Sequence, residues 1–242
     1  MGFYIVSIVI VLVCAGLAAN ASAKVRSAFK AYGAMPTHSH MTGYDTATKL
    51  LKRGGATDIS VGRVRGELTD HYHPTKNIVN LSDSVYGDDS IAAVAVAAHE
   101  VGHVMQKKAG YAPYKIRSAL VKVTNIGSRL AMPLVLIGLL LDLLILSTDS
   151  QVGFYMAMAG VVLYGLSTVF ALVTLPVELD ASRRAKKMLV DEGILQPAEL
   201  PYADKMLDAA ANTYVASLLT SLLYFLRFAL WVLMLFGGRR RR

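Results

Sequence analysis

The chain has 242 residues, of which 54% are hydrophobic and 17% charged, and its formal net charge is +8. A mean hydropathy of +0.44 is well above that of an ordinary soluble domain, so we expect membrane spans. The excess positive charge lies beside the apolar segments and in the C-terminal tail, without a pattern of interleaved aromatic and basic residues, which argues against a nucleic-acid partner.

The first predicted element is an apolar segment, residues 3–19, of nearly the length that a bilayer core requires. Ala21-Ser22-Ala23 resembles the cleavage site of a signal peptide, which gives an alternative interpretation. However, no Lys or Arg precedes the apolar run, and three follow it within residues 24–30. Positive charge after the segment favours a retained transmembrane anchor whose N-terminus lies outside. The one cysteine, Cys14, lies in this segment, so no intrachain disulfide can form.

Residues 24–129 are long enough to form a small core, and their pattern predicts a mixed α and β catalytic region. We expect a short helix over 46–52 and strands over 59–64 and 76–81, with a turn at 73–75. Four histidines of this region are interpreted as loop residues: His38, His40, His71 and His73. The alternative for His71 or His73 is a hydrogen bond to the oxyanion that develops during catalysis.

A helix is predicted from about Ser90 to Lys108, and it carries the most informative motif of the chain, His99-Glu100-Val101-Gly102-His103. Residues four apart lie on one face of a helix, so His99 and His103 can present two imidazoles to one ion. Glu100 lies beside that face, where the general base of a zinc hydrolase would act on a water molecule. Small and apolar residues lead into the motif at helical spacing, which predicts a buried helix.

Two further apolar segments, 130–147 and 152–177, predict a transmembrane hairpin. The region 24–129 carries 15 Lys and Arg against 8 Asp and Glu, whereas the link 148–151 has no Lys or Arg. Basic residues also follow the third segment directly, at the start of 178–213. The positive-inside rule therefore predicts a multi-pass membrane protein with 24–129 and 178–213 in the cytoplasm and 148–151 outside.

A zinc hydrolase needs a third protein ligand and leaves one position open for water. Glu178 is the best candidate, because it follows the third apolar segment directly and lies on the same side of the membrane as the two histidines. The alternative is a carboxylate that caps the helix end. The other candidates are Glu67, Asp70, His71, His73 and Asp180.

The last apolar segment, residues 214–236, precedes a basic tail at 237–242. A simple fourth crossing would place the tail outside and Arg227 within the bilayer, at a cost of a few kcal/mol. A re-entrant or interfacial hairpin is the alternative, with Arg227 extended toward the headgroups or paired with Asp142 of the second span. The sequence leaves both open.

Five stretches resemble the bacterial zinc-dependent neutral metallopeptidases of the YugP type, and the likeness runs from the first span to Arg227. They are Gly66-Glu-Leu-Thr-Asp-His71-Tyr, Ser90 to His103, Gly110-Tyr-Ala-Pro113, Arg117-Ser-Ala-Leu and Thr174 to Ala185. That family is similar in layout to the HtpX and Ste24 group, in which a Glu of an E-x-x-A-D pattern completes the metal site. The resemblance implies a protease of the bacterial cell membrane and supports Glu178 as the third ligand. Ser182 stands where that group has Asp, so Asp180 or Asp70 is expected to take over its contact with a ligand histidine.

The sequence therefore predicts a membrane α-helical protein of about four apolar segments with a small, zincin-like α+β metallopeptidase domain in the cytoplasm. One catalytic Zn²⁺ is expected on His99, His103 and Glu178, with Glu100 as the general base. Expected substrates are membrane proteins or peptides near the lipid bilayer. A non-catalytic scaffold with a structural zinc site is the alternative, although such a site has no need of Glu100 and usually closes with four ligands. A metal transporter fits less well, because Asp142 and Arg227 are the only charged residues within the four apolar segments.

Overall fold

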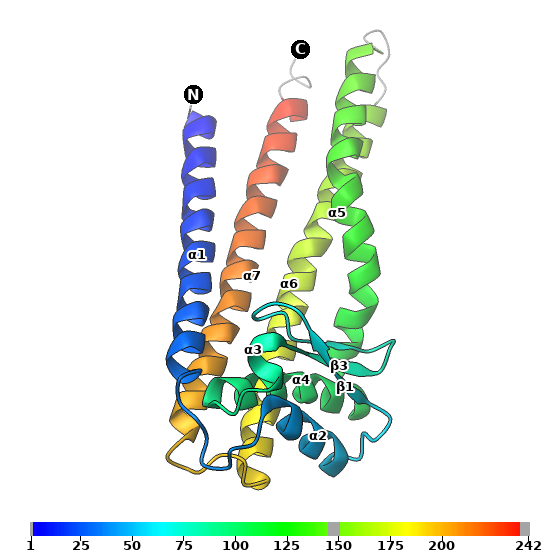
Figure 1. Ribbon diagram of the computed structural model, residues 1–242. Helices are drawn as coiled ribbons and strands as arrows, with labels where there is room; N and C mark the ends of the chain where they lie inside the picture. Colours follow the sequence, from blue (N-terminus) through cyan, green and yellow to red (C-terminus); the bar gives the residue numbers. More distant parts are fainter. Residues whose placement is uncertain (1, 145–150, 238–242) are drawn as a thin grey trace. The chain divides into compact units, whose positions relative to one another are not determined.

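The computed structural model describes residues 2–144 and 151–237, and these are mostly helical (Figure 1). The helices are α1 (Gly2–Tyr32), α2 (Gly43–Arg53), α3 (Asp83–Tyr86), α4 (Ile91–Lys108), α5 (Ala112–Leu144), α6 (Val152–Asp191) and α7 (Leu200–Gly237). The strands are β1 (Ser60–Val64), β2 (His71–His73) and β3 (Ile78–Ser82). The chain divides into two compact units. The span unit contains Met1–Ala19, Ile116–Thr174 and Val215–Arg242, and the site unit contains Asn20–Lys115 and Leu175–Tyr214.

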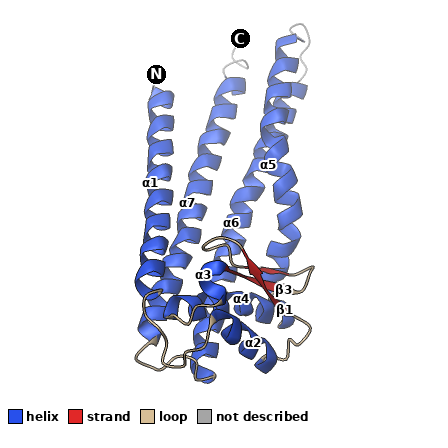
Figure 2. Ribbon diagram, in the orientation of Figure 1, coloured by secondary structure: helices blue, strands red, loops and turns tan. Residues whose placement is uncertain are grey.

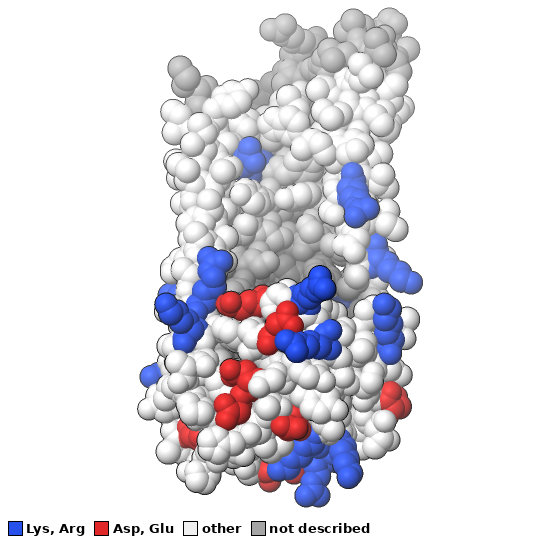
Figure 3. All heavy atoms as spheres, in the orientation of Figure 1, with Lys and Arg blue, Asp and Glu red and all other residues white. Residues whose placement is uncertain are grey.

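Four helices of the described chain, α1, α5, α6 and α7, are long and apolar enough to cross a membrane. Many large apolar side chains on them are exposed, and on the face that Figure 3 shows few charged side chains lie over these helices. The expected membrane α-helical fold with four apolar segments is therefore present. Each helix extends well beyond the apolar run that predicted it, because a helix satisfies its backbone hydrogen bonds in water as well as in lipid.

Two of these helices bear on alternatives that the sequence left open. Helix α1 runs without interruption across Ala21-Ser22-Ala23. Helix α7 is continuous over 38 residues, without the turn that a re-entrant hairpin over 214–236 would need. The side chain of Asp142 lies outside the described residues, so the pairing of Arg227 with Asp142 stays untested.

Within the span unit, small residues allow α5 and α6 to approach closely. A Cβ on Gly160 would lie 2.6 Å from the carbonyl oxygen of Ala131. The hydroxyl of Thr168 on α6 lies 3.0 Å from that of Ser221 on α7, which links these helices by a hydrogen bond. Small residues and hydroxyl contacts of this kind are typical of helix packing in membranes, where apolar burial alone gives little driving force.

The site unit contains a three-stranded sheet in the order β1-β3-β2 (Figure 2). Strand β1 pairs parallel with β3, and β2 pairs antiparallel with β3, with Tyr72 opposite Val79. The expectation that His71 and His73 lie in a loop was wrong, because both belong to β2. A three-residue edge strand is too short to show an alternating pattern, and it forms here by pairing with β3.

Helix α4 forms the centre of the core of the site unit. Ser90 caps it by accepting a hydrogen bond from the backbone N–H of Ala93, and the helix ends at Lys108, close to the predicted bounds. Residues Ile91 to Ala95 are all buried, so the helix is covered on nearly every side. Helix α2 packs along it through Leu50 and Leu51. A helix held in this way presents its motif residues from a rigid support.

Candidate metal centre

His99 and His103 lie one turn apart on α4, as the i and i+4 spacing requires. Their ring centroids are 4.8 Å apart and the rings are nearly perpendicular, at 87°. Both side chains are nearly covered, with 12% and 10% exposed. The two imidazoles therefore converge from one face of a buried helix.

Helix α6 brings Glu178 to the same point, although 75 positions separate it from His103 in the sequence. One carboxylate oxygen, Oε2, lies 3.2 Å from Nε2 of His99 and 3.4 Å from Nε2 of His103. The helices can approach because α4 carries Gly102 at the crossing, where a Cβ would lie 2.6 Å from the carbonyl oxygen of Ala181. Glu178 itself is only 1% exposed. The sequence prediction thus names three residues that the structure brings together.

Glu178 and the two histidines affect one another's ionisation. Burial opposes ionisation of Glu178, but hydrogen bonds and charge from His103 and His99 outweigh it, so the pKa of Glu178 lies well below its usual range. Burial also opposes the charged form of His103, but Glu178 and Glu100 outweigh that effect and raise the pKa of His103. The three groups therefore hold a buried negative charge facing two basic nitrogens.

This donor set fits a zinc ion. The ligand atoms of His99, His103 and Glu178 all lie within 4.8 Å of one another, and they are the one such group of His, Cys, Asp or Glu found within residues 2–144 and 151–237. Two imidazole nitrogens and one carboxylate oxygen are ligands that zinc accepts, and three protein ligands leave a fourth position for water or substrate.

The other ring nitrogen of each histidine has a hydrogen-bond partner that fixes the orientation of the ring. Nδ1 of His99 lies 3.1 Å from the Ser182 hydroxyl, and Nδ1 of His103 lies 3.0 Å from Oε1 of Gln106. Such partners hold a ligand histidine in the tautomer that leaves Nε2 free for a metal. Ser182 therefore makes the contact for which the resemblance led us to expect Asp180 or Asp70.

Gln106 extends this arrangement, and the sequence reasoning missed it. Its side chain is fully buried, and its Nε2 donates to the carbonyl oxygen of Val177 at 2.7 Å and to Asp180 at 2.9 Å. Arg184 in turn donates to Asp180 at 2.6 Å. Gln106 thus links His103 to Asp180. The sequence offered one signal, the position of Gln106 three residues after His103 on the same helix.

Glu100 lies beside the three candidate ligands and is held by the edge strand. Its Oε2 accepts a hydrogen bond of 2.9 Å from the backbone N–H of Tyr72 in β2, and the side chain is mostly buried. Because the N–H of Tyr72 points to Glu100, it is not used in the pairing of β2 with β3. The position and the fixed carboxylate are what a general base near the metal needs.

The other candidate ligands lie elsewhere. Both oxygens of Asp70 accept hydrogen bonds from Ser82. His71 contacts the carbonyl of Thr69 and the amide of Asn80, and His73 accepts a hydrogen bond from the N–H of Lys76. Glu67 is exposed. In the loop before α2, the ring of His40 pairs with Asp89.

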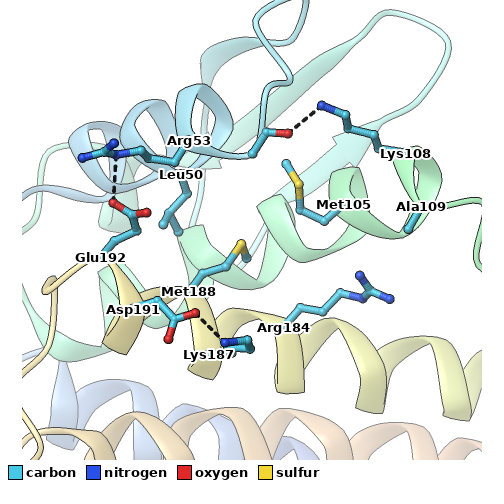
Figure 4. A pocket seen from close by; sticks show the side chains of 11 residues that line it. Leu50, Arg53, Met105, Lys108, Ala109, Arg184, Lys187, Met188, Asp191 and Glu192 are labelled. Atoms are coloured by element: carbon cyan, nitrogen blue, oxygen red, sulfur yellow. Dashed lines mark hydrogen bonds and ion pairs between the residues drawn. The ribbon is translucent and has the colours of Figure 1, made fainter.

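Two cavities lie against α4. The smaller, which we call the apolar cavity, has a volume of about 230 Å³ and contains His99 and Glu100 in its wall. Its other lining residues are Val25, Leu68, Asp70, Val96, Met206, Leu207, Ala210, Thr213 and Tyr214. The larger, about 430 Å³, is lined from α2, α4 and α6 and contains none of the three candidate ligands (Figure 4). Its charged side chains are engaged with partners, as in the pairs of Arg53 with Glu192 and Lys187 with Asp191.

Comparison with known proteins agrees with this geometry. A family model described as "Putative neutral zinc metallopeptidase" matches residues 5–233. The "Putative membrane protease YugP" of Bacillus subtilis (strain 168) is 41% identical over 224 residues, which cover 93% of this chain and 94% of that protein. No solved structure matches.

Proposed function

The chain belongs to the "Putative neutral zinc metallopeptidase" family, and on that premise we propose that it is an integral membrane zinc endopeptidase. One observation carries the proposal: three zinc-type ligands from α4 and α6 converge within 4.8 Å, and Glu100 lies beside them. A structural zinc site is usually closed by four protein ligands, whereas three ligands beside a carboxylate and a cavity suit hydrolysis.

His99, His103 and Glu178 would hold the ion. When bound, zinc would make a water molecule acidic at neutral pH and polarise the carbonyl of the peptide bond. Glu100 takes a proton from the attacking water as the C–O bond forms. It then passes this proton to the leaving nitrogen as the C–N bond breaks. The Tyr72 N–H holds Glu100 in position for both transfers. Ser182 and Gln106 keep the two histidines in the orientation in which Nε2 faces the ion.

The proposed substrates are membrane proteins or peptides held close to the bilayer. Glu178 directly follows the apolar run 152–177 within the same helix. It is four residues beyond Thr174, the last residue of α6 in the span unit, and at 1.5 Å per residue this is about 6 Å along the helix. By the positive-inside rule, the site unit is proposed to lie in the cytoplasm of a multi-pass protein.

The experiment measures cleavage and metal content on the same detergent-purified samples. Casein and a quenched peptide serve as substrates, and the variants are Glu100→Gln and Glu178→Ala. We expect Glu100→Gln to retain zinc and lose cleavage, and Glu178→Ala to lose zinc. Glu67→Gln is the matched control, because Glu67 is exposed and outside the site, and it should behave as wild type.

Two results would contradict the proposal. Full zinc occupancy in Glu178→Ala would show that Glu178 is not a ligand. Zinc binding without any cleavage that depends on Glu100 would favour the non-catalytic scaffold.

A further inference from the structure

The apolar cavity offers a site for part of a substrate, because it shares its wall with the proposed chemistry. His99 and Glu100 both line it. A group held in this cavity therefore lies next to the metal ligand and to the general base. Six of its other lining residues are apolar, and they come from α1, α4, α7 and the loop between β1 and β2: Val25, Leu68, Val96, Met206, Leu207 and Ala210.

The volume of the cavity indicates what it can hold. At about 230 Å³ it is smaller than the roughly 300–1,000 Å³ of sites for whole small molecules. It is larger than a cavity of about 150 Å³ that holds a benzene ring. A single large apolar side chain, such as that of Leu or Phe, matches this range.

The backbone at Leu68 supports a role in binding. Leu68 has φ of 55°, a left-handed conformation that Leu rarely adopts. Such a conformation costs about 1–2 kcal/mol and persists only where the surrounding structure holds it, most often at functional sites. Here it places an apolar side chain in the wall of the cavity.

The one carboxylate of the wall besides Glu100 already has partners. Both oxygens of Asp70 accept hydrogen bonds from Ser82, through its N–H at 2.7 Å and its hydroxyl at 2.9 Å. Both oxygens of Asp70 are therefore engaged at the end of β3, which makes Asp70 a poorer partner for a basic side chain than a free carboxylate would be.

We propose that the apolar cavity binds a large apolar side chain of the substrate at one of the two positions that flank the scissile bond. Val96, Met206 and Ala210 then set the upper limit on the size of that side chain. The proposal rests on the peptidase function proposed above and adds the class of residue at which the enzyme cleaves.

The first experiment measures the preference of the purified, zinc-loaded full chain. Cleavage sites in casein are mapped by mass spectrometry, and the best site is copied into quenched peptides. Each flanking position in turn carries Gly, Ala, Leu, Phe, Lys or Asp. At one position, we expect kcat/KM for Leu and Phe to exceed that for Ala by about tenfold or more, with Lys and Asp lowest.

The second experiment fills the cavity. Ala210→Phe should lower the ratio of kcat/KM for the Phe peptide to kcat/KM for the Ala peptide by about tenfold or more. Ala210→Val should lower the same ratio by a smaller factor, so the proposal can be tested even if Ala210→Phe does not fold. Asn212→Phe is the matched control, because Asn212 is exposed and lies about 200° around α7 from Ala210, and it should leave the preference unchanged.

Binding provides a readout that does not depend on turnover. In the Glu100→Gln protein, the affinity for fluorescently labelled peptides is measured by anisotropy. The Phe peptide should bind more tightly than the Ala peptide, and Ala210→Phe should remove the difference. Zinc content should be unchanged in every Ala210 variant.

The outcomes separate the two proposals. Equal rates along the peptide series, or Lys as the best residue, would overturn the apolar cavity as the specificity site while cleavage by the enzyme stands. An absence of any Glu100-dependent cleavage would overturn the peptidase function and this inference with it.

Discussion

Gln106 contacts three groups at once, and one of them is the candidate ligand His103. Its carbonyl oxygen faces His103, and its amide donates to Val177 and Asp180. We expect Gln106→Leu to lower zinc affinity by about 10- to 100-fold, because His103 loses the partner that orients it. The residual zinc after titration with a chelator, measured by elemental analysis, checks this prediction.

Two further variants show whether the loss comes from orientation. Gln106→Glu keeps an acceptor for His103 but cannot donate to Val177, so it should retain more zinc than Gln106→Leu. Gln196→Leu, at an exposed position, should retain zinc as wild type does. If Gln106→Leu folds and binds zinc as tightly as wild type, Gln106 does not position His103.

Asp70 makes stability depend on pH. Burial raises the pKa of Asp70 above its ordinary value of 3.8, and hydrogen bonds from Ser82 and the charge of His71 only partly offset this. The folded state therefore binds the proton more tightly than the unfolded state. The contribution to stability is fully present below pH 3.8 and is lost as the pH rises through the folded pKa.

Asp70→Asn should remove this dependence. Asn keeps an oxygen that accepts from the Ser82 N–H but carries no charge. As the pH rises from about 4 to 7, the Tm of wild type should fall relative to that of the variant. Thermal unfolding followed by circular dichroism at several pH values measures the difference, and parallel Tm curves would disprove the assignment.

Among single residues, the sequence predicted those whose relative position depends on one helix alone. The i and i+4 spacing determines how His99 and His103 lie on a helix, whatever surrounds it. Gln106 could not be assigned, because its role depends on contacts with Val177 and Asp180, more than 70 positions away. Ser182 was identified only as a substitute for Asp, and its contact with His99 depends on how α4 and α6 cross.

At the scale of elements, the crossing of α4 and α6 assembles the centre. Gly102→Ala places a methyl group where the carbonyl of Ala181 lies at 2.6 Å, and backbone cannot move aside as a flexible side chain can. We expect the helices to separate, with a loss of about 1–3 kcal/mol in stability. His99 and His103 would then lie too far from Glu178 to share an ion, so zinc binding should fall as well.

The control is a helical glycine with open space around it. Nothing lies within 4 Å of a Cβ on Gly16 of α1, so Gly16→Ala should be neutral or stabilising, by up to ~1 kcal/mol. Thermal unfolding and zinc content are measured on both variants. Normal zinc binding in Gly102→Ala would show that the close approach at Gly102 is not needed for the site.

The elements also differ in how well a sequence pattern predicts them. Helix α4 combines a capping serine, a long apolar stretch and lysines in its last turn, so its bounds were predicted almost to the residue. Strand β2 has three residues and is defined by its pairing with β3 and by the hydrogen bond from Tyr72 to Glu100. The sequence of His71–His73 alone contains no pattern that predicts these partners.

At the scale of the whole molecule, long apolar runs predicted the four candidate spans, but not how far each helix extends. Hydropathy records where the apolar run ends, whereas a helix ends where its backbone is capped or broken. The apolar run at 152–177 thus belongs to one 40-residue helix that also carries Glu178 and Ser182. The proposed third ligand, Glu178, is therefore joined to a proposed span without an intervening loop.

The proposed orientation in the membrane can be tested by labelling single cysteines. In a Cys14→Ser background, a cysteine is placed at Gln151, the last residue of the link 148–151 that lacks Lys and Arg, or at Thr75, in the turn between β2 and β3. Both positions are exposed. Charge asymmetry places the region around Thr75 inside, so a membrane-impermeant maleimide should label Gln151→Cys in intact cells and Thr75→Cys only after permeabilisation. The reverse pattern would put the candidate metal centre outside the cell and exclude cytoplasmic substrates, whereas labelling of both positions in intact cells would contradict a crossing between them.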